Sequence, residues 1–294
     1  MRFASYSLHG REGLAVQTPE GWCGVFYGEQ GLRTLEAVIP SGDAALKTLG
    51  VWLRGAGRAL DEAEMVFLPP LRQPPKIICV GLNYRDHSAE SDYEQPAYPT
   101  LFGRFATSLV GHGQPIVRPT VSEQLDYEGE LAAVIGLGGR HIRVEDALKH
   151  VCGWSIFNEA SIRDYQFKSP QWTMGKNFDG TGAFGPAFVT ADELPEGARG
   201  LRLETRLNGT VVQSASTSDM VFDVATQIAV ISEGVTLQPG DVIVTGTPAG
   251  VGLARKPPLW MKPGDVVEVE IEQIGVLRNP VIAEAGSAAA SAAV

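Results

Sequence analysis

The chain has 294 residues, of which 44% are hydrophobic, so it is long enough to bury one large core or two smaller ones. Asp and Glu (34) outnumber Lys and Arg (24), which gives a net charge of −10 and an isoelectric point near 5.0. This balance argues against nucleic acid and against an anionic membrane as partners, because both bind basic surfaces. An anionic small molecule would have to be captured by a few local cations.

The three cysteines, Cys23, Cys79 and Cys152, are odd in number, widely spaced and without a CxxC pattern. They indicate neither a disulfide framework nor a zinc site. The first residues lack the apolar stretch of a secretion signal, and no run approaches the roughly eighteen apolar residues of a membrane helix. We therefore expect a protein of the reducing cytoplasm.

Residues 1–70 are predicted to form a small α+β domain. Short apolar runs alternate with glycine turns, as in residues 21–28, and a helical pattern follows across residues 44–63. The segment 68–75 then contains four prolines, which fix φ and remove backbone donors, so it is predicted to be a stiff linker. The domain boundary is therefore placed near residue 70.

Strand-like segments dominate residues 71–282, the predicted second domain. Asn208-Gly209 predicts a hairpin, because both central positions of a type I′ turn favour residues that tolerate positive φ. A helix is predicted across residues 221–234, and the Ala/Ser/Gly-rich end, residues 283–294, is predicted to be a disordered tail. The sheet is expected to be mixed or mainly antiparallel and rolled up. The predicted strands are 76–80, 131–135, 187–189, 201–207, 211–212, 241–244 and 265–271.

Two glutamates, Glu128 and Glu130, lead into the apolar, β-prone segment 131–135. On a strand, residues i and i+2 share a face, so both carboxylates would point into the same buried region and repel each other there. A hard divalent cation resolves that conflict, because it takes oxygen ligands and leaves positions open for a substrate. The alternative is an edge strand on which both carboxylates are solvated. Asp126 is expected to matter less for metal binding.

A third carboxylate and a lysine follow further along the chain. Glu159 ends a hydrophobic run, where it either completes the ligand set or begins a helix beside the N-cap-like Asn158. Lys176 lies in a loop between two glycines. It is either a solvated charge or, close to a metal, a fixed cation for a developing enolate.

His87 and Glu90 are the candidates for proton transfer. They are three residues apart, so one helical turn brings them face to face, and the carboxylate would orient the imidazole and stabilise its protonated form. The alternative is a surface pair without a catalytic role. The remaining histidines lack a comparable acidic motif and are interpreted as structural: His9, His112, His141 and His150.

Six segments together resemble the fumarylacetoacetate hydrolase superfamily, and within it the acylpyruvate hydrolase type. Residues 78–90 read ICVGLNYRDHSAE, similar to the family signature VGxNYxxHxxE, and residues 245–252 read TGTPAGVG, similar to its TGTPxGVG loop. Four segments lie between them in the family's order: residues 101–104, the Glu128/Glu130 segment, residues 159–164 and the Lys176 loop. The resemblance covers about residues 76 to 282.

This resemblance implies an α+β fold with a mixed β-roll core and a small N-terminal lobe. It also implies that Glu128, Glu130 and Glu159 bind Mg²⁺ or Mn²⁺. Glu159 stands where the family usually has an aspartate, which moves the carboxylate outward by roughly 1.5 Å. Arg104 stands where a lysine is common. Because the arginine fork suits a carboxylate, Arg104 is expected to help bind an acidic substrate.

The family's chemistry implies metal-assisted hydrolysis of a C–C bond in a 2,4-dioxo acid, of the acylpyruvate or fumarylpyruvate type, in the catabolism of aromatic or related compounds. In this interpretation His87, supported by Glu90, activates a water, and Lys176 stabilises the departing enolate. The expected substrate-binding residues are Arg104, Arg163, Gln166 and Thr247.

Other outcomes of the same enolate chemistry stay open. They are oxaloacetate-type decarboxylation or tautomerisation, hydroxymuconate-type isomerisation, and hydration, although the His87/Glu90 pair favours hydrolysis. A non-catalytic ligand-binding protein, with turnover lost through Glu159, is a lesser alternative. The expected partner is a small dioxo acid rather than nucleic acid or a membrane, and the resemblance implies a homodimer.

Overall fold

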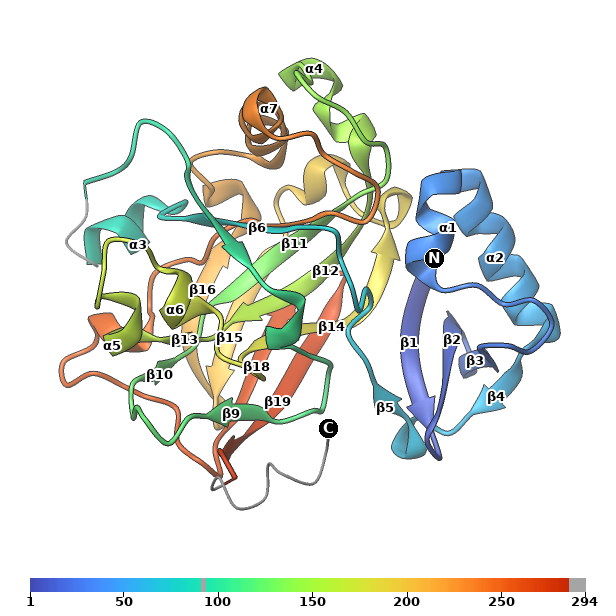
Figure 1. The fold of residues 1–294 in the computed structure, drawn as a ribbon, viewed down its shortest axis with the longest axis horizontal. Coiled ribbons are helices and arrows are strands. Elements are labelled where there is room, and N and C mark those ends of the chain that lie inside the picture. The colour runs from blue at the N-terminus through green and yellow to red at the C-terminus, as the bar shows by residue number, and fades with distance from the viewer. Residues whose placement is uncertain (91–93, 286–294) are drawn as a thin grey trace.

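The computed structural model describes residues 1–90 and 94–285 and confirms an α+β fold with mixed sheets (Figure 1). The strands are β1 (Arg2–Leu8), β2 (Arg11–Thr18), β3 (Gly21–Phe26), β4 (Arg58–Leu60), β5 (Val66–Phe67), β6 (Ile77–Gly81), β7 (Thr100–Arg104), β8 (Leu109–Val110), β9 (Ile116–Arg118), β10 (Leu125–Asp126), β11 (Gly129–Ile135), β12 (Val151–Glu159), β13 (Ser161–Ile162), β14 (Gly182–Thr190), β15 (Arg202–Leu207), β16 (Thr210–Ser216), β17 (Val242–Val244), β18 (Val266–Ile271) and β19 (Gly275–Ala283). The α-helices are α1 (Leu35–Val38), α2 (Asp43–Ala56), α3 (Arg85–Glu90), α4 (Val144–Ala147), α5 (Arg163–Gln166), α6 (Thr173–Lys176) and α7 (Val224–Gly234).

The strands form one long sheet and two smaller ones. The long sheet runs β4-β3-β2-β1-β14-β12-β11-β17-β6-β7, with β5 added beside β1 and β8 beside β14. A five-stranded sheet, β16-β15-β18-β19-β9, packs against the β11-β12-β14 part of the long sheet. β10 and β13 form a two-stranded ladder. The two larger sheets enclose most of the apolar interior between them, as expected for a rolled core.

The N-terminal lobe is an antiparallel meander of β1 to β4, with α2 packed against it (Figure 1). The pattern across residues 44–63 predicted too long a helix, because α2 ends at Ala56. Gly57 follows, and its N–H closes the last helical turn on the carbonyl of Leu53. Glycine disfavours helix continuation, and the next residues pair as β4 with β3.

The lobe is continuous with the rest of the protein. β1 pairs antiparallel with β14, with Phe3 opposite Phe188, so the lobe extends the long sheet. One apolar cluster also joins Phe3 and Leu14 to Phe157 of β12. The boundary near residue 70 stays a prediction. The proline-rich segment 68–75 does link β5 to β6 without a helix or strand of its own.

The central strand pair β11/β12 positions the catalytic candidates. Both strands are buried along their whole length. Alternate residues of β11 belong to two different apolar clusters, so both faces of the strand are covered. Their antiparallel register places Glu130 opposite Phe157 and Gly129 opposite Asn158. The beginning of β11 therefore lies beside the end of β12, which brings residues from two distant parts of the sequence to one edge.

Several local predictions are confirmed. Asn208 and Gly209 have φ of 51° and 79° and turn β15 into β16. Every predicted strand is present, and β14 and β16 extend further than predicted. The predicted helix begins at Val224 rather than at residue 221, because the Asp223 side chain caps it by accepting the Thr226 N–H.

The predicted C-terminal tail begins too early, since Ala283 ends β19, and residues 286–294 of that prediction lie outside the described residues. Within residues 1–90 and 94–285, no helix is both long enough and apolar enough to cross a membrane.

Candidate active site

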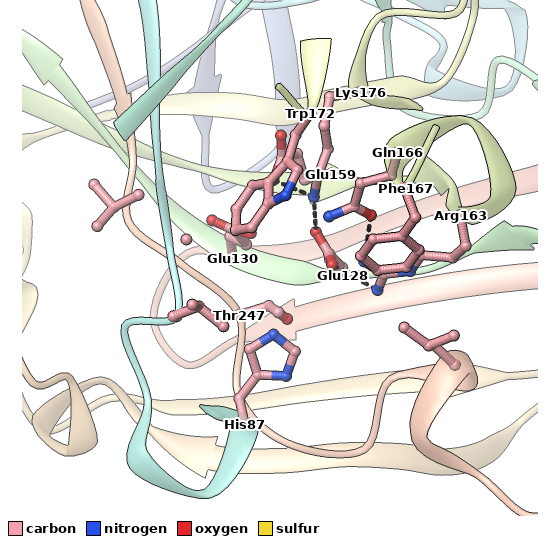
Figure 2. A pocket seen from close by; sticks show the side chains of 14 residues that line it. His87, Glu128, Glu130, Glu159, Arg163, Gln166, Phe167, Trp172, Lys176 and Thr247 are labelled. Carbon is pink, nitrogen blue, oxygen red and sulfur yellow. Dashed lines mark hydrogen bonds and ion pairs between the residues drawn. The ribbon is translucent and has the colours of Figure 1, made fainter. Parts of the chain in front are cut away.

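A narrow cavity of about 30 Å³ opens where β11 begins and β12 ends, beneath α3, α5 and α6. Figure 2 shows the three glutamates and Lys176 on one side of this catalytic pocket and His87 on the other. Glu90 and Arg104 do not line it. The predicted site residues that line it are His87, Glu128, Glu130, Glu159, Arg163, Gln166, Lys176 and Thr247.

The three glutamates form a compact, buried carboxylate cluster. Glu128 directly precedes β11, Glu130 is the second residue of that strand, and Glu159 is the last residue of β12. One oxygen from each lies within 4.8 Å of the others. The Glu159 N–H also donates to the Glu128 carbonyl at 2.8 Å, which fixes the two strand ends together. The helix-start alternative for Glu159 is wrong, and so is a solvated edge strand.

Two buried cations partly neutralise the cluster. Nζ of Lys176 lies 2.5 Å from Glu128 and 3.0 Å from Glu159, and the Arg163 guanidinium lies 2.6 Å from the other Glu128 oxygen. Burial alone would raise the pKa of Glu128, but Arg163 and Lys176 outweigh it and hold that pKa well below its usual range. Burial likewise opposes the charge of Lys176, yet Glu128 and Glu159 raise its pKa above the ordinary value. Lys176 is therefore a permanent cation, and the solvated-loop alternative is wrong.

Glu130 is the carboxylate that the protein leaves without a cation. Among the described residues it makes no ion pair, and its Oε2 accepts the Gly246 N–H at 2.5 Å. Burial, and then the charges of Glu159 and Glu128, raise the pKa of Glu130 well above its usual value. Three buried carboxylates whose oxygens lie this close together, one of them without a cation, form an environment that a hard divalent cation stabilises. The residues present therefore fit such an ion.

His87 and Glu90 form the predicted pair at the other side of the pocket. Both lie on α3, and Nδ1 of His87 is 3.0 Å from Oε1 of Glu90. The Glu90 carboxylate also accepts the backbone N–H groups of Gly250 and Val251. With Nδ1 held by Glu90, the Nε2 atom remains to exchange a proton with a substrate.

The backbone amides of the 245–252 loop bind carboxylates of the protein itself. Its amides donate to Glu130 from Gly246, to Glu90 from Gly250 and Val251, and to Asp126 from Gly252. This loop therefore fixes the candidate site residues from behind, and no local sequence pattern indicated these pairings. Thr247 does line the pocket, where its hydroxyl donates to the Gly129 carbonyl and accepts from Gln213.

Arg104 lies differently from expectation. It is 3% exposed, and its guanidinium donates to Ser108, Thr181 and the Ala160 carbonyl behind the pocket. One nitrogen is 3.5 Å from Glu159. The Arg104 guanidinium already donates to these protein oxygens, and the side chain does not reach the cavity. We therefore reassign Arg104 from substrate binding to positioning Glu159.

Asp126 is a functional candidate whose importance the sequence interpretation missed. It is fully buried and lies 2.9 Å from Nε of Arg163. It also accepts the N–H groups of Gly252 and Leu253. Asp126 thus fixes both the guanidinium that contacts Glu128 and the loop behind the site. Its i, i+2 spacing from Glu128 was the signal that could have revealed it.

Two aromatic residues, Phe167 and Trp172, also line the pocket and were missed. Figure 2 shows the Trp172 indole beside the glutamates and the Phe167 ring near Arg163. Both stand in segments whose other residues carry charge or turn signals, so neither hydrophobic periodicity nor a motif identified them. They supply an apolar wall to an otherwise ionic pocket.

Comparison with known proteins gives consistent relatives. A family model described as fumarylacetoacetate (FAA) hydrolase C-terminal matches residues 76–282. The human protein named oxaloacetate tautomerase FAHD2A, mitochondrial, is 42% identical over 252 residues, which are 85% of this chain and 80% of the human one. The structure of fumarylacetoacetate hydrolase from Exiguobacterium antarcticum has a TM-score of 0.82 and 39% identity, covering 97% of this chain and 100% of that one. The structure of maleylpyruvate hydrolase from Sphingobium sp. SYK-6, in complex with manganese(II) and pyruvate, has a TM-score of 0.80 and 26% identity with the same coverage.

Proposed function

The chain belongs to the fumarylacetoacetate hydrolase family, as its motifs predicted, and we propose that it is a divalent-metal-dependent tautomerase of a small 2-oxo acid such as oxaloacetate. The observation that carries the proposal is a pocket of about 30 Å³ in which His87 faces Lys176 and three carboxylates. The name of the human relative supports this activity over the C–C hydrolysis that the sequence favoured, which becomes the second candidate.

The carboxylate cluster would hold the metal. Glu128, Glu130 and Glu159 offer oxygen ligands, for which Mg²⁺ or Mn²⁺ is suited, and the manganese of the maleylpyruvate hydrolase structure supports this choice. A bound divalent cation would supply Lewis-acid stabilisation of the negative charge that develops on the C2 oxygen of the substrate.

We assign the proton transfer and the stabilisation of charge to side chains of the pocket. Tautomerisation moves one proton between C3 and the C2 oxygen. Nε2 of His87 removes the C3 proton, the C–H electron pair forms the C2–C3 double bond, and the C2 oxygen then takes up a proton. The Lys176 ammonium donates a hydrogen bond to that oxygen as its charge develops.

The substrate carboxylate would bind beside Arg163. The Arg163 guanidinium donates to Oε1 of Gln166 at 2.9 Å, which leaves the amide NH₂ of Gln166 to donate to the substrate. The Thr247 hydroxyl already donates its proton to the Gly129 carbonyl, so its remaining lone pair would accept from the enol O–H of the substrate rather than bind the carboxylate. These three residues therefore keep their proposed substrate-binding role, whereas Arg104 acts through Glu159.

A specific observation keeps C–C hydrolysis as the second candidate. The His87–Glu90 pair, held by two loop amides, is equally suited to activating a water, and the maleylpyruvate hydrolase shares the fold at 26% identity. A ligand-binding protein without turnover has no need of this pair, so the pair argues against that alternative. Decarboxylation would begin with the same substrate and is distinguished by its products.

The test follows oxaloacetate and an acylpyruvate with the Mg²⁺- or Mn²⁺-loaded protein in D₂O. We expect rapid enol-to-keto conversion and deuterium exchange at C3, without pyruvate, carbon dioxide or a carboxylic acid fragment. Lys176→Met should slow this conversion, whereas Lys149→Met, at a side chain that is 73% exposed, should not. Release of a carboxylic acid from the acylpyruvate, with no acceleration for oxaloacetate, would establish the hydrolase instead.

The remaining expectations stay proposals. They are a homodimer, a cytoplasmic location, and no nucleic-acid or membrane partner, while the human relative is named as mitochondrial. Light scattering after size-exclusion chromatography measures the oligomeric state directly, and a monomer at working concentration would exclude the dimer.

A further inference from the structure

We propose that a second cavity beside the catalytic pocket binds an apolar arm of the substrate, so that the enzyme accepts 2-oxo acids with an alkyl or aryl group at the far end. This outer cavity has an open volume of about 840 Å³, against about 30 Å³ for the catalytic pocket. The two share Leu82, Phe167 and Trp172 as a common wall. The proposal rests on the proposed function in one respect, since the 2-oxo acid head must occupy the inner pocket.

The lining of the outer cavity is suited to an apolar group. Phe167 and Leu101 remain 47% and 36% exposed there, and exposed large apolar side chains beside a catalytic pocket mark a binding surface. An alkyl or aryl arm would cover them and remove them from water. The apolar lining residues are Leu82, Pro96, Leu101, Phe102, Phe167, Pro170 and Trp172.

The distribution of charge separates the two cavities. Arg163 and Lys176 line the inner pocket, where a carboxylate finds cations. The charged residues lining the outer cavity are Glu94 and Lys168, which have opposite signs. The Lys168 ammonium lies 3.2 Å from the ring centroid of Tyr165 and is engaged by that ring. A second carboxylate would therefore lose hydration in the outer cavity without gaining a net positive charge there. An uncharged arm has no such desolvation cost.

The wall between the cavities is built before any substrate binds. The Trp172 indole packs on the backbone of Gly81, where a Cβ atom would lie 2.5 Å from Cζ3 of the ring. The indole also packs against Phe102, with ring centroids 5.4 Å apart at 70°. A preformed aromatic wall costs little conformational entropy on binding, which favours ligand affinity.

The experiment measures how binding affinity depends on the length of the apolar arm, and it measures turnover separately. Calorimetry with Mg²⁺-loaded protein follows the binding of unbranched 2-oxo acids with increasing chain length, and kinetics follow oxaloacetate. We expect affinity to increase about fourfold per methylene group, the factor for burying one CH₂. Leu101→Ser should weaken binding of the longest acid by roughly fivefold and leave oxaloacetate kinetics unchanged. Ile282→Ser, which alters a strand residue on β19 that is 43% exposed, should change neither.

The outcomes distinguish this proposal from the proposed function. Oxaloacetate turnover together with an affinity that does not depend on chain length overturns the outer subsite alone. A steep dependence on chain length without tautomerisation of oxaloacetate contradicts the proposed function and leaves the subsite in place. If Leu101→Ser binds the longest acid as tightly as the wild type does, the outer cavity does not bind the arm. This holds even if the wild-type affinity rises steeply with chain length.

Discussion

Oε1 of Glu90 lies 3.0 Å from Nδ1 of His87, and the same carboxylate accepts the Gly250 N–H at 2.8 Å. Glu90 thus ties the candidate base on α3 to the loop that follows β17. That loop also holds Glu130 through the Gly246 amide. The candidate base and one proposed metal ligand are therefore both held by the same short piece of backbone, which links their positions across the pocket.

His87→Ala should lower kcat by about 10²–10⁴-fold, the usual contribution of a positioned base. Affinity for Mg²⁺ should not change, because His87 lies across the pocket from the glutamates. Stopped-flow measurement of tautomerisation and calorimetric metal binding check the two parts. His9→Ala, at a histidine that is 77% exposed, is the matched control. A rate near that of the wild type in His87→Ala would assign the proton transfer to another group.

Asp126→Asn should destabilise the fold by about 3 kcal/mol, the lower end for breaking a buried ion pair, because Glu128 still contacts Arg163. It should also weaken substrate binding, since Arg163 loses the group that orients it. Thermal unfolding and KM are the measurements, with Asp192→Asn as the half-exposed control. The sequence alone led us to expect only that Asp126 matters less than Glu128 for metal binding. An unchanged melting temperature together with an unchanged KM would show that Asp126 stabilises neither Arg163 nor the loop.

Glu159→Asp should retain metal binding with about tenfold lower affinity, because the carboxylate retracts by roughly 1.5 Å from the site. Glu159→Ala should lose most of the affinity. Arg104→Lys should have a smaller effect of the same kind, since it loosens the group that positions Glu159 at 3.5 Å. Glu145→Ala, at a 64% exposed side chain, is the control for lost negative charge. Unchanged affinity in Glu159→Ala would show that Glu159 is not a ligand.

The sequence predicted the residues of the site better than the contacts among them. Alternation and turn residues were sufficient for β11, β15 and the Asn208-Gly209 hairpin, because those signals are local. The Glu128/Glu130 spacing was also local. Arg104 was misplaced because its partners, Thr181 and Ala160, are distant in the chain.

The roles of the loop amides and of Trp172 depended on tertiary contacts in the same way. Gly81 illustrates the limit: its importance comes from the Trp172 ring packed on it, and the two residues are ninety-one positions apart in the sequence. No periodicity relates such positions. Charge pairing within a buried cluster is likewise decided by the fold, so the sequence could name the carboxylates but not say which of them lacks a cation.

Metal binding should release protons, and affinity should therefore rise with pH. Burial and neighbouring carboxylates raise the pKa of both Glu130 and Glu159, so the metal-free protein holds protons there at pH values where a free glutamate is ionised. A divalent cation needs the ionised form and displaces those protons. The dissociation constant should fall by about tenfold per pH unit while one proton is displaced, and become constant above the raised pKa. Calorimetry from about pH 5 to about pH 8, in buffers of different ionisation enthalpy, counts the protons released. Glu130→Gln should bind metal more weakly and release fewer protons, whereas Glu145→Gln should behave as the wild type. Metal affinity that does not change with pH would mean that the cluster is already ionised, and would contradict the raised pKa values on which this prediction depends.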